Sequence, residues 1–137
     1  MPVFLGIFVL SIASIHLAAL SFGWYVHLTG FDIPMHILAG TWLACALWYY
    51  VFEKTDSVSF RNKWVAVLLG VGAVALVGVF WEMYEFFGDV FIRHSHPFWT
   101  EPGWIYADTL KDLLDDSIGA AIAMLLLVKL RWKKLPR

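Results

Sequence analysis

Acidic residues in this chain of 137 residues recur at spacings that place them on shared helix faces. Three groups stand out, namely Asp32 with His36, Glu82 with Glu85, and Asp108 with Asp112 and Asp115. Residues three, four or seven positions apart share one face of a helix. Carboxylate and imidazole ligands together suit zinc, manganese or iron, and an all-oxygen site suits magnesium or calcium. We therefore expect a divalent metal ion, with ligands from His36, Glu82, Glu85, Asp112 and Asp32, and with Asp108 or Asp115 as a catalytic base.

Several of these residues also have a purely structural interpretation. Asp32 precedes an early proline and could cap the second helix, and Asp108 could cap the fourth. Lys111 and Asp115 are four apart and could form an ion pair. Of the adjacent Asp115 and Asp116, we expect one to face solvent or cap a neighbouring group.

The elements that must position these residues are membrane helices. The chain is 61% hydrophobic and 15% charged, with a mean hydropathy of +0.71, whereas soluble domains carry about 25% charged residues. Crossing a bilayer takes about 20 apolar residues. Four segments are long enough: 2–28, 33–52, 64–88 and 109–130. We predict an all-α, integral membrane four-helix bundle that forms one domain over residues 1–137.

Charge is distributed unequally between the two ends of these segments. Nine of the eleven carboxylates fall at one end, and eight of the ten lysines and arginines fall at the other. Because basic residues favour the cytoplasmic side, both termini should be cytoplasmic, in a multi-pass protein of the inner (plasma) membrane. The acidic end then faces outward and includes an aromatic-rich loop over 89–108, where Pro97 and Pro102 argue against a continuous helix. The basic residues form no base-stacking patch, so we expect no nucleic-acid partner.

Three of the acids, Glu82, Glu85 and Asp112, lie within apolar runs and have no obvious lysine or arginine partner. A charged side chain at the centre of a membrane helix costs about 2.5–3.5 kcal/mol on insertion scales. These acids should therefore point into the bundle and converge on one pocket. Without a bound cation, such crowded carboxylates would have to share protons.

Three motifs on separate spans resemble the YjdF-like family of small bacterial inner-membrane proteins. They are Asp-Ile-Pro-Met-His-Ile-Leu-Ala-Gly over 32–40, Trp-Glu-Met-Tyr-Glu over 81–85, and Asp-Thr-Leu-Lys-Asp-Leu-Leu-Asp-Asp-Ser-Ile-Gly-Ala over 108–120. The VanZ-like family is more distantly similar in helix order and in its closing acidic helix. The resemblance implies an acidic site within the membrane and supplies no reaction.

Three functions are compatible with this pattern. A bound metal could activate water to hydrolyse a lipid or an envelope precursor. Carboxylates within a membrane also mark proton or cation paths in transporters, and a homo-oligomer could complete such a path. An accessory subunit could instead use the acids to bind the basic residues of a partner. In each case the lipid bilayer is the immediate surrounding.

Overall fold

The computed structural model describes residues 1–54, 62–93 and 102–132, and these form helices without any strand. The helices are α1 (Pro2–Phe22), α2 (Trp24–His27), α3 (Asp32–Leu47), α4 (Lys63–Phe87) and α5 (Pro102–Arg131). Two π-helical turns, η1 (Trp48–Glu53) and η2 (Gly88–Arg93), continue α3 and α4 without a break. The all-α fold class is therefore confirmed. Residues 94–101 of the aromatic loop, which include Pro97, lie outside the described residues.

The first predicted segment, 2–28, is two helices rather than one. Gly23 has a φ of 68°, and its N–H bonds to the carbonyl of Ala19 at the end of α1. This left-handed conformation ends a helix and strongly favours glycine. The four-residue α2 follows, and Gly30, with a φ of 77°, turns the chain into α3. The second and third segments agree with α3–η1 and α4 to within one residue, although η2 extends the third.

The fourth helix begins seven residues earlier than predicted, at Pro102 instead of residue 109. Proline lacks an N–H, but the first turn of a helix leaves its N–H groups unbonded anyway, so proline is well tolerated there. Taking Pro102 as evidence against a helix was wrong for this reason. The early start also places Asp108 inside α5, so it does not cap that helix.

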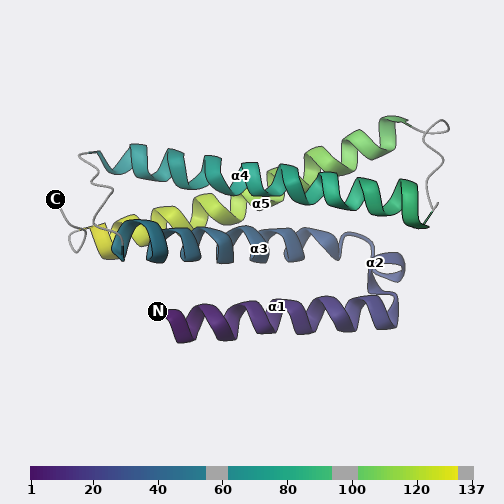
Figure 1. Cartoon of the computed structure of the whole chain (residues 1–137), viewed down its shortest axis with the longest axis horizontal. Coiled ribbons are helices and arrows are strands. Elements are labelled where there is room, and N and C mark those ends of the chain that lie inside the picture. The colour runs from purple at the N-terminus through teal and green to yellow at the C-terminus, as the bar shows by residue number, and fades with distance from the viewer. Residues whose placement is uncertain (55–61, 94–101, 133–137) are drawn as a thin grey trace.

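The helices form a bundle in which α5 packs against both α3 and α4, and α1 packs mainly against α3 (Figure 1). α3 and α5 run in the same direction, as their contacts show. Asp32 meets Lys111 near the starts of the two helices, Thr41 donates to the Gly119 carbonyl at 3.2 Å, and Glu53 meets Arg131 near their ends. The start of α1 and the end of α5 lie at the same end of the bundle (Figure 1).

Small residues let α3 and α5 approach closely. A methyl group added to Gly40 would lie 2.1 Å from the Asp116 carbonyl oxygen, and one added to Gly119 would lie 2.1 Å from that of Ile37. Small side chains at helix contacts are typical of membrane bundles. Below this contact, toward the ends of both helices, the buried core includes Trp48 and Met124.

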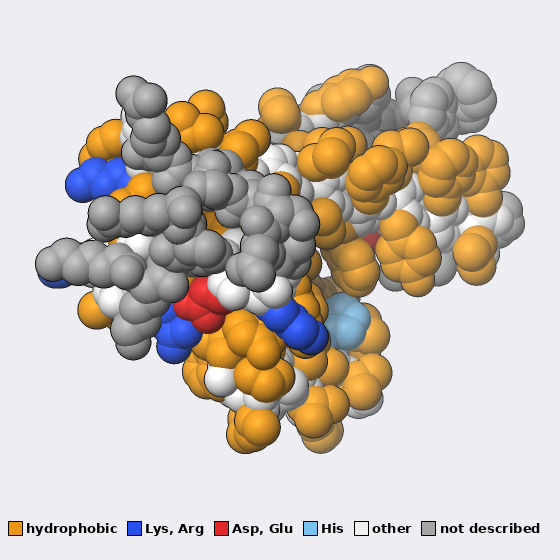
Figure 2. Space-filling model, turned by 60° about the vertical axis from the view of Figure 1, so that its left-hand side comes forward, with side chains coloured by type: hydrophobic (Ala, Val, Ile, Leu, Met, Phe, Trp, Pro, Cys, Tyr) orange, Lys and Arg blue, Asp and Glu red, His pale blue; other side chains and the backbone are white. Residues whose placement is uncertain are grey.

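An ion pair joins the ends of α3–η1 and α5. The Arg131 guanidinium donates to both carboxylate oxygens of Glu53, at 2.9 and 3.0 Å, and the Trp48 indole N–H donates to one of them at 2.9 Å. We call these three residues the Glu53 cluster. Lysine and arginine side chains gather around this end of the molecule (Figure 2). Each charge in the cluster therefore has a partner of opposite sign.

Apolar side chains cover much of the outer surface (Figure 2). Three helical segments are long and apolar enough to cross a membrane: Pro2–Phe22, Asp32–Glu53 and Lys63–Ile92. α5 has 30 residues, which is also sufficient length, but the half nearer its start carries four acidic residues, Asp108, Asp112, Asp115 and Asp116. It is the fourth candidate span, and its polar face is covered by α3 and α4.

Candidate cation site at the acidic end

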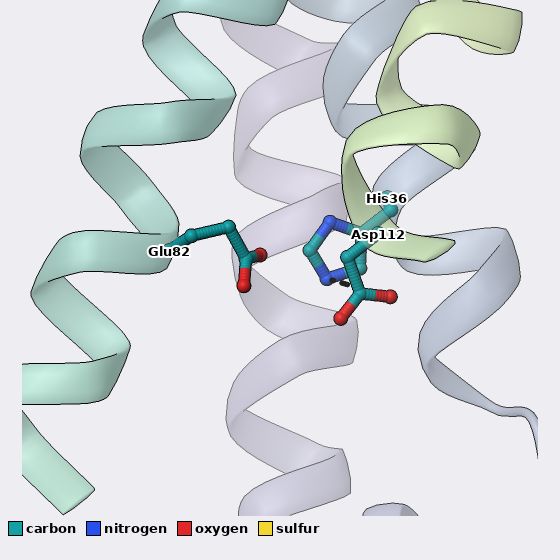
Figure 3. Close-up of side chains that lie close together, drawn as sticks. All are labelled: His36, Glu82 and Asp112. Carbon is teal, nitrogen blue, oxygen red and sulfur yellow. Dashed lines mark ion pairs between the residues drawn. The ribbon is translucent and has the colours of Figure 1, made fainter. Parts of the chain in front are cut away.

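Side chains from α3, α4 and α5 converge near the start of α5. His36, Glu82 and Asp112 each offer one ligand atom, and these three atoms lie within 4.8 Å of one another. The side chains point toward each other from three different helices (Figure 3). Such a separation is close to the span between two ligands of one metal ion, since metal–ligand distances are about 2.0–2.2 Å for zinc. The arrangement can therefore hold a metal ion after small side-chain movements.

His36 lies between two carboxylates of α5. Its Nε2 is 3.7 Å from Asp112 Oδ1, and its Nδ1 is 3.4 Å from Asp116 Oδ1. Asp112 and Asp116 are one helical turn apart, so their side chains lie one above the other on the face toward α3. Both are buried, at 4% exposed each. The imidazole thus has a carboxylate near each ring nitrogen.

Asp116 is a site residue that sequence reasoning missed. We expected either Asp115 or Asp116 to face solvent or to cap a neighbouring group, and the solvent-facing alternative was wrong, because both are buried. The backbone of Asp116 faces Gly40, and its side chain fits against Gly78 of α4, where an added methyl group would lie 2.8 Å from its Oδ2. The spacing of four from Asp112 could have identified it.

Lys111 is held by three carboxylates at the outer edge of the site. Its ammonium group donates to Asp32 and, at 2.6 Å, to Asp112, and it lies 3.7 Å from Asp108. The oxygens of these acids also lie within 4.8 Å of one another. Asp112 is therefore shared between Lys111 and the His36–Glu82–Asp112 group.

These contacts change four of the sequence interpretations. Lys111 is held by three other carboxylates, not by the predicted pairing with Asp115. Asp112, expected to lack a basic partner, has one. Asp32 occupies the first helical position, after the N-cap residue Phe31, and its carboxylate pairs with Lys111. Asp108, interpreted from the sequence as a possible cap of the fourth helix, is exposed beside Lys111.

Two buried carboxylate oxygens in the described part of the molecule have no hydrogen-bond partner, Glu82 Oε1 and Asp115 Oδ2. A buried polar atom without a partner costs roughly 1–3 kcal/mol, and more when it is charged. Glu85 lies one turn beyond Glu82 on α4, partly buried, and belongs to neither three-residue group. A proton, a water molecule or a cation would supply the partner that the oxygens of Glu82 and Asp115 lack.

The acidic end is thus strongly unbalanced among the described side chains. Seven carboxylates lie there: Asp32, Glu82, Glu85, Asp108, Asp112, Asp115 and Asp116. Lys111 and a protonated His36 would together supply two positive charges. Burial makes every unmatched charge costly, so the arrangement is chemically suited to bind a cation.

Comparison with known proteins supplies a family. No curated protein and no solved structure matches the chain. The family model described as "Predicted membrane protein (DUF2238)" matches residues 2–133, nearly the whole chain. That description agrees with the apolar helices and their exposed hydrophobic faces. The chain therefore belongs to this family of predicted membrane proteins.

Proposed function

We propose that the protein binds a divalent cation through His36, Glu82 and Asp112. The observation that carries this proposal is the meeting of these three ligand atoms within 4.8 Å, with Glu82 contributing a buried oxygen that lacks a partner. A purely structural cluster would be expected to pair its buried oxygens, as the Glu53 cluster does. A divalent ion would offset the excess negative charge and complete the coordination of Glu82.

The donor set favours zinc or manganese over magnesium or calcium. One imidazole nitrogen and two carboxylates form a mixed set, whereas magnesium and calcium prefer oxygen ligands alone. Histidine ligands also commonly use their second ring nitrogen to contact a carboxylate, which fixes the ring. Asp116, beside Nδ1 of His36, is suited to that supporting role when Nε2 binds the metal.

We propose that the acidic end faces outward from a bacterial inner membrane, as the positive-inside pattern and the YjdF-like motifs indicate. Eight of the ten lysines and arginines belong to the opposite end, and such residues favour the cytoplasmic side. A metal held at the outer end would meet lipid headgroups and envelope precursors. Reporter fusions after residues 54 and 132 should both report a cytoplasmic location, and a periplasmic signal from either would contradict this orientation.

A hydrolytic role follows if the bound ion carries water. A metal ion lowers the pKa of its water toward neutrality and polarises a phosphoester or amide. Asp115, buried with an unpartnered oxygen, would accept a proton, or the exposed Asp108 would do so. Transport is less well supported, because the described core beyond Gly119 is apolar, with Ala44, Ala120 and Met124 fully buried.

The direct test is metal content together with thermal stability. Protein purified in detergent should contain about one zinc or manganese per chain and lose stability when treated with EDTA. A metal ion whose free concentration is 1,000 times its Kd stabilises the folded protein by about 4.1 kcal/mol. Such a gain is readily measured as a rise in melting temperature.

Matched variants assign the response to the site. His36→Asn and Asp112→Asn should abolish the metal-dependent shift. His16→Asn is the control, because His16 contacts Tyr25 at 2.7 Å on the α1 side of the molecule and should leave the shift unchanged. A metal-free preparation whose melting temperature does not respond to zinc, manganese, magnesium or calcium would refute the proposal.

A further inference from the structure

Thr109 of α5 touches the proposed cation site without belonging to its ligand set. Its side chain forms a hydrogen bond with the carboxylate of Glu82 on α4. A carboxylate only accepts hydrogen bonds, so the Thr109 hydroxyl donates. Oε1 of the same carboxylate is buried and has no partner. Glu82 is therefore partly engaged within the chain, and one buried oxygen stays available to an ion.

The packing of α4 against α5 places Thr109 beside Glu82. The two helices run in opposite directions (Figure 1), and Gly78 of α4 lies against the side chain of Asp116 of α5. One turn further along α4 and one turn earlier on α5, Glu82 is level with Asp112, and the ligand atoms of these two acids lie within 4.8 Å. Thr109 precedes Asp112 by three residues and so shares its helix face. The same contact face thus positions both the ligand on α5 and the partner of the ligand on α4.

Residues of α5 also hold the other two ligands. Lys111 donates to Oδ1 of Asp112 at 2.6 Å. On the far side of the imidazole, Asp116 Oδ1 lies 3.4 Å from Nδ1 of His36. Each of the three ligands therefore has one polar atom engaged by a residue of α5. A metal ion between them would receive one atom from each ligand while these contacts last.

The number of ligand atoms decides which ions suit such a site. Calcium takes about six to eight oxygens and often receives two of them from one carboxylate. Zinc usually has about four ligands at short distances, so three protein atoms and one water complete its coordination. Glu82 could give both oxygens to a larger ion only by losing the hydrogen bond from Thr109. That hydrogen bond therefore disfavours calcium and is compatible with zinc.

We propose that Thr109 determines the metal specificity of the cation site, because its hydroxyl restricts Glu82 to one ligand oxygen and so favours zinc over calcium. This inference rests on the proposed cation site and assigns its selectivity to a residue that binds no metal. Thr109 acts through Glu82 and is a positioning residue. Hydrogen-bond partners of metal ligands typically contribute about 10–100-fold in metal affinity.

Calorimetric titration of the detergent-purified protein with zinc and with calcium tests the proposal. Thr109→Val removes the hydroxyl and keeps the shape of the side chain. We expect this variant to bind zinc about tenfold more weakly and to bind calcium as before, because calcium gains the second oxygen of Glu82 as the orienting bond is lost. The preference for zinc then falls about tenfold. Thr109→Ser keeps the hydroxyl and should retain the preference of the unaltered protein.

Thr41→Val is the matched control. The Thr41 hydroxyl also joins α5 to another helix, since it donates to the Gly119 carbonyl at 3.2 Å. Thr41 lies five residues beyond His36 on α3 and belongs to neither of the three-residue groups. Its replacement should lower the melting temperature and leave the affinities for zinc and calcium unchanged. The control therefore separates a lost hydrogen bond between helices from a lost hydrogen bond to a ligand.

The outcomes separate this inference from the cation site itself. Thr109→Val with the zinc and calcium affinities of the unaltered protein would overturn the role of Thr109 and leave the site standing. An equal loss of affinity for both ions would overturn the assignment of specificity. The same change in Thr109→Ser would attribute the effect to packing and overturn the role of the hydroxyl. Absence of metal binding by the unaltered protein would remove the cation site, and this inference with it.

Discussion

The parallel helices α3 and α5 carry a polar cluster at each end, and the two clusters are built differently. At one end, Glu53 is paired with Arg131 through two hydrogen bonds and receives a third from Trp48. At the other, Lys111 is shared among three carboxylates, while Glu82 and Asp115 keep buried oxygens without partners. The same pair of helices thus ends once in a balanced cluster and once in an unbalanced one.

Under the proposed function, this difference separates a structural anchor from a binding site. Partners supplied by the chain itself satisfy the Glu53 cluster, so it needs nothing further and serves to hold η1 against α5. At the acidic end, the burial of carboxylates that the described side chains do not fully neutralise lowers the stability of the folded protein. Perturbed, crowded carboxylates of this kind are frequent at functional sites, although structural networks also contain them. The comparison is useful because the two interpretations predict opposite responses to the same substitutions.

The largest expected effect comes from breaking the close contact between α3 and α5 that lies between the two polar clusters. Gly119→Leu would place its first side-chain carbon 2.1 Å from the Ile37 carbonyl oxygen, so α3 and α5 must separate. We expect a loss of more than about 4 kcal/mol in stability, with the metal-dependent shift lost as well, measured as melting temperature in detergent. Gly72→Leu is the matched control, because nothing lies within 4 Å of that position. Equal melting temperatures for the two variants would contradict the close packing.

A second experiment replaces Lys111, the lysine among the described residues of the acidic end. Lys111→Met leaves Asp32, Asp108 and Asp112 without their shared cation and should destabilise the metal-free protein by about 2 kcal/mol. This is less than the 3–5 kcal/mol typical of a broken buried pair, because the Lys111 side chain is 35% exposed. The three freed acids form a second candidate metal group, so metal content should rise from one ion per chain toward two.

Elemental analysis of the purified variant measures that change. Lys129→Met provides the control on the same helix, at an exposed position of the basic end, and should alter neither stability nor metal content. An unchanged metal content in Lys111→Met would mean that the second group of acids does not bind a metal.

How far the sequence alone leads can be judged from these residues. Hydropathy identified the elements, and helical spacing placed His36, Glu82 and Asp112 on faces that the structure brings together. Their role as ligands stays a prediction. Spacing gives the face of one helix, but it does not give the rotation of one helix against another. That rotation depends on contacts such as Gly40 with Asp116, which is why the burial of Asp116 was missed.

The pairing of Lys111 was missed for a related reason. Within one helix, Asp115 is a suitable partner by spacing, and the sequence offers no sign that Asp32 lies closer. The parallel arrangement of α3 and α5 decides the matter, since it brings the starts of both helices together. Long-range pairing of this kind is a property of the assembled bundle.

At the balanced end, a single truncation should be harmful and a double truncation should be much less so. Arg131→Leu leaves Glu53, 19% exposed, with the Trp48 N–H as its described partner, and should cost about 2 kcal/mol, because breaking an ion pair strands the other charge. Replacing Glu53 with leucine as well should recover most of that loss, since apolar pairs often substitute for buried ion pairs at little cost. Melting temperatures of the two single variants and the double variant give the coupling energy. A double variant as unstable as the sum of the singles would show that the pair does not act as a unit.

The smallest effect is the most discriminating, because one substitution is made at both ends. Glu53→Gln removes a charge that Arg131 needs and should destabilise by about 1–2 kcal/mol, because charge-assisted hydrogen bonds of about 1.5–3 kcal/mol become neutral ones of about 0.5–1.5 kcal/mol. Glu82→Gln removes a charge from a cluster with too many, so the metal-free protein should become more stable, by up to about 1 kcal/mol. The same variant should lose the metal-dependent shift, which Glu53→Gln should retain. Melting curves of both variants, recorded with EDTA and with manganese, measure the stability of each metal-free protein and its metal-dependent shift. If Glu82→Gln destabilised the metal-free protein as Glu53→Gln does, the carboxylate of Glu82 would already be matched within the chain, and the acidic end would be a second anchor in place of a site.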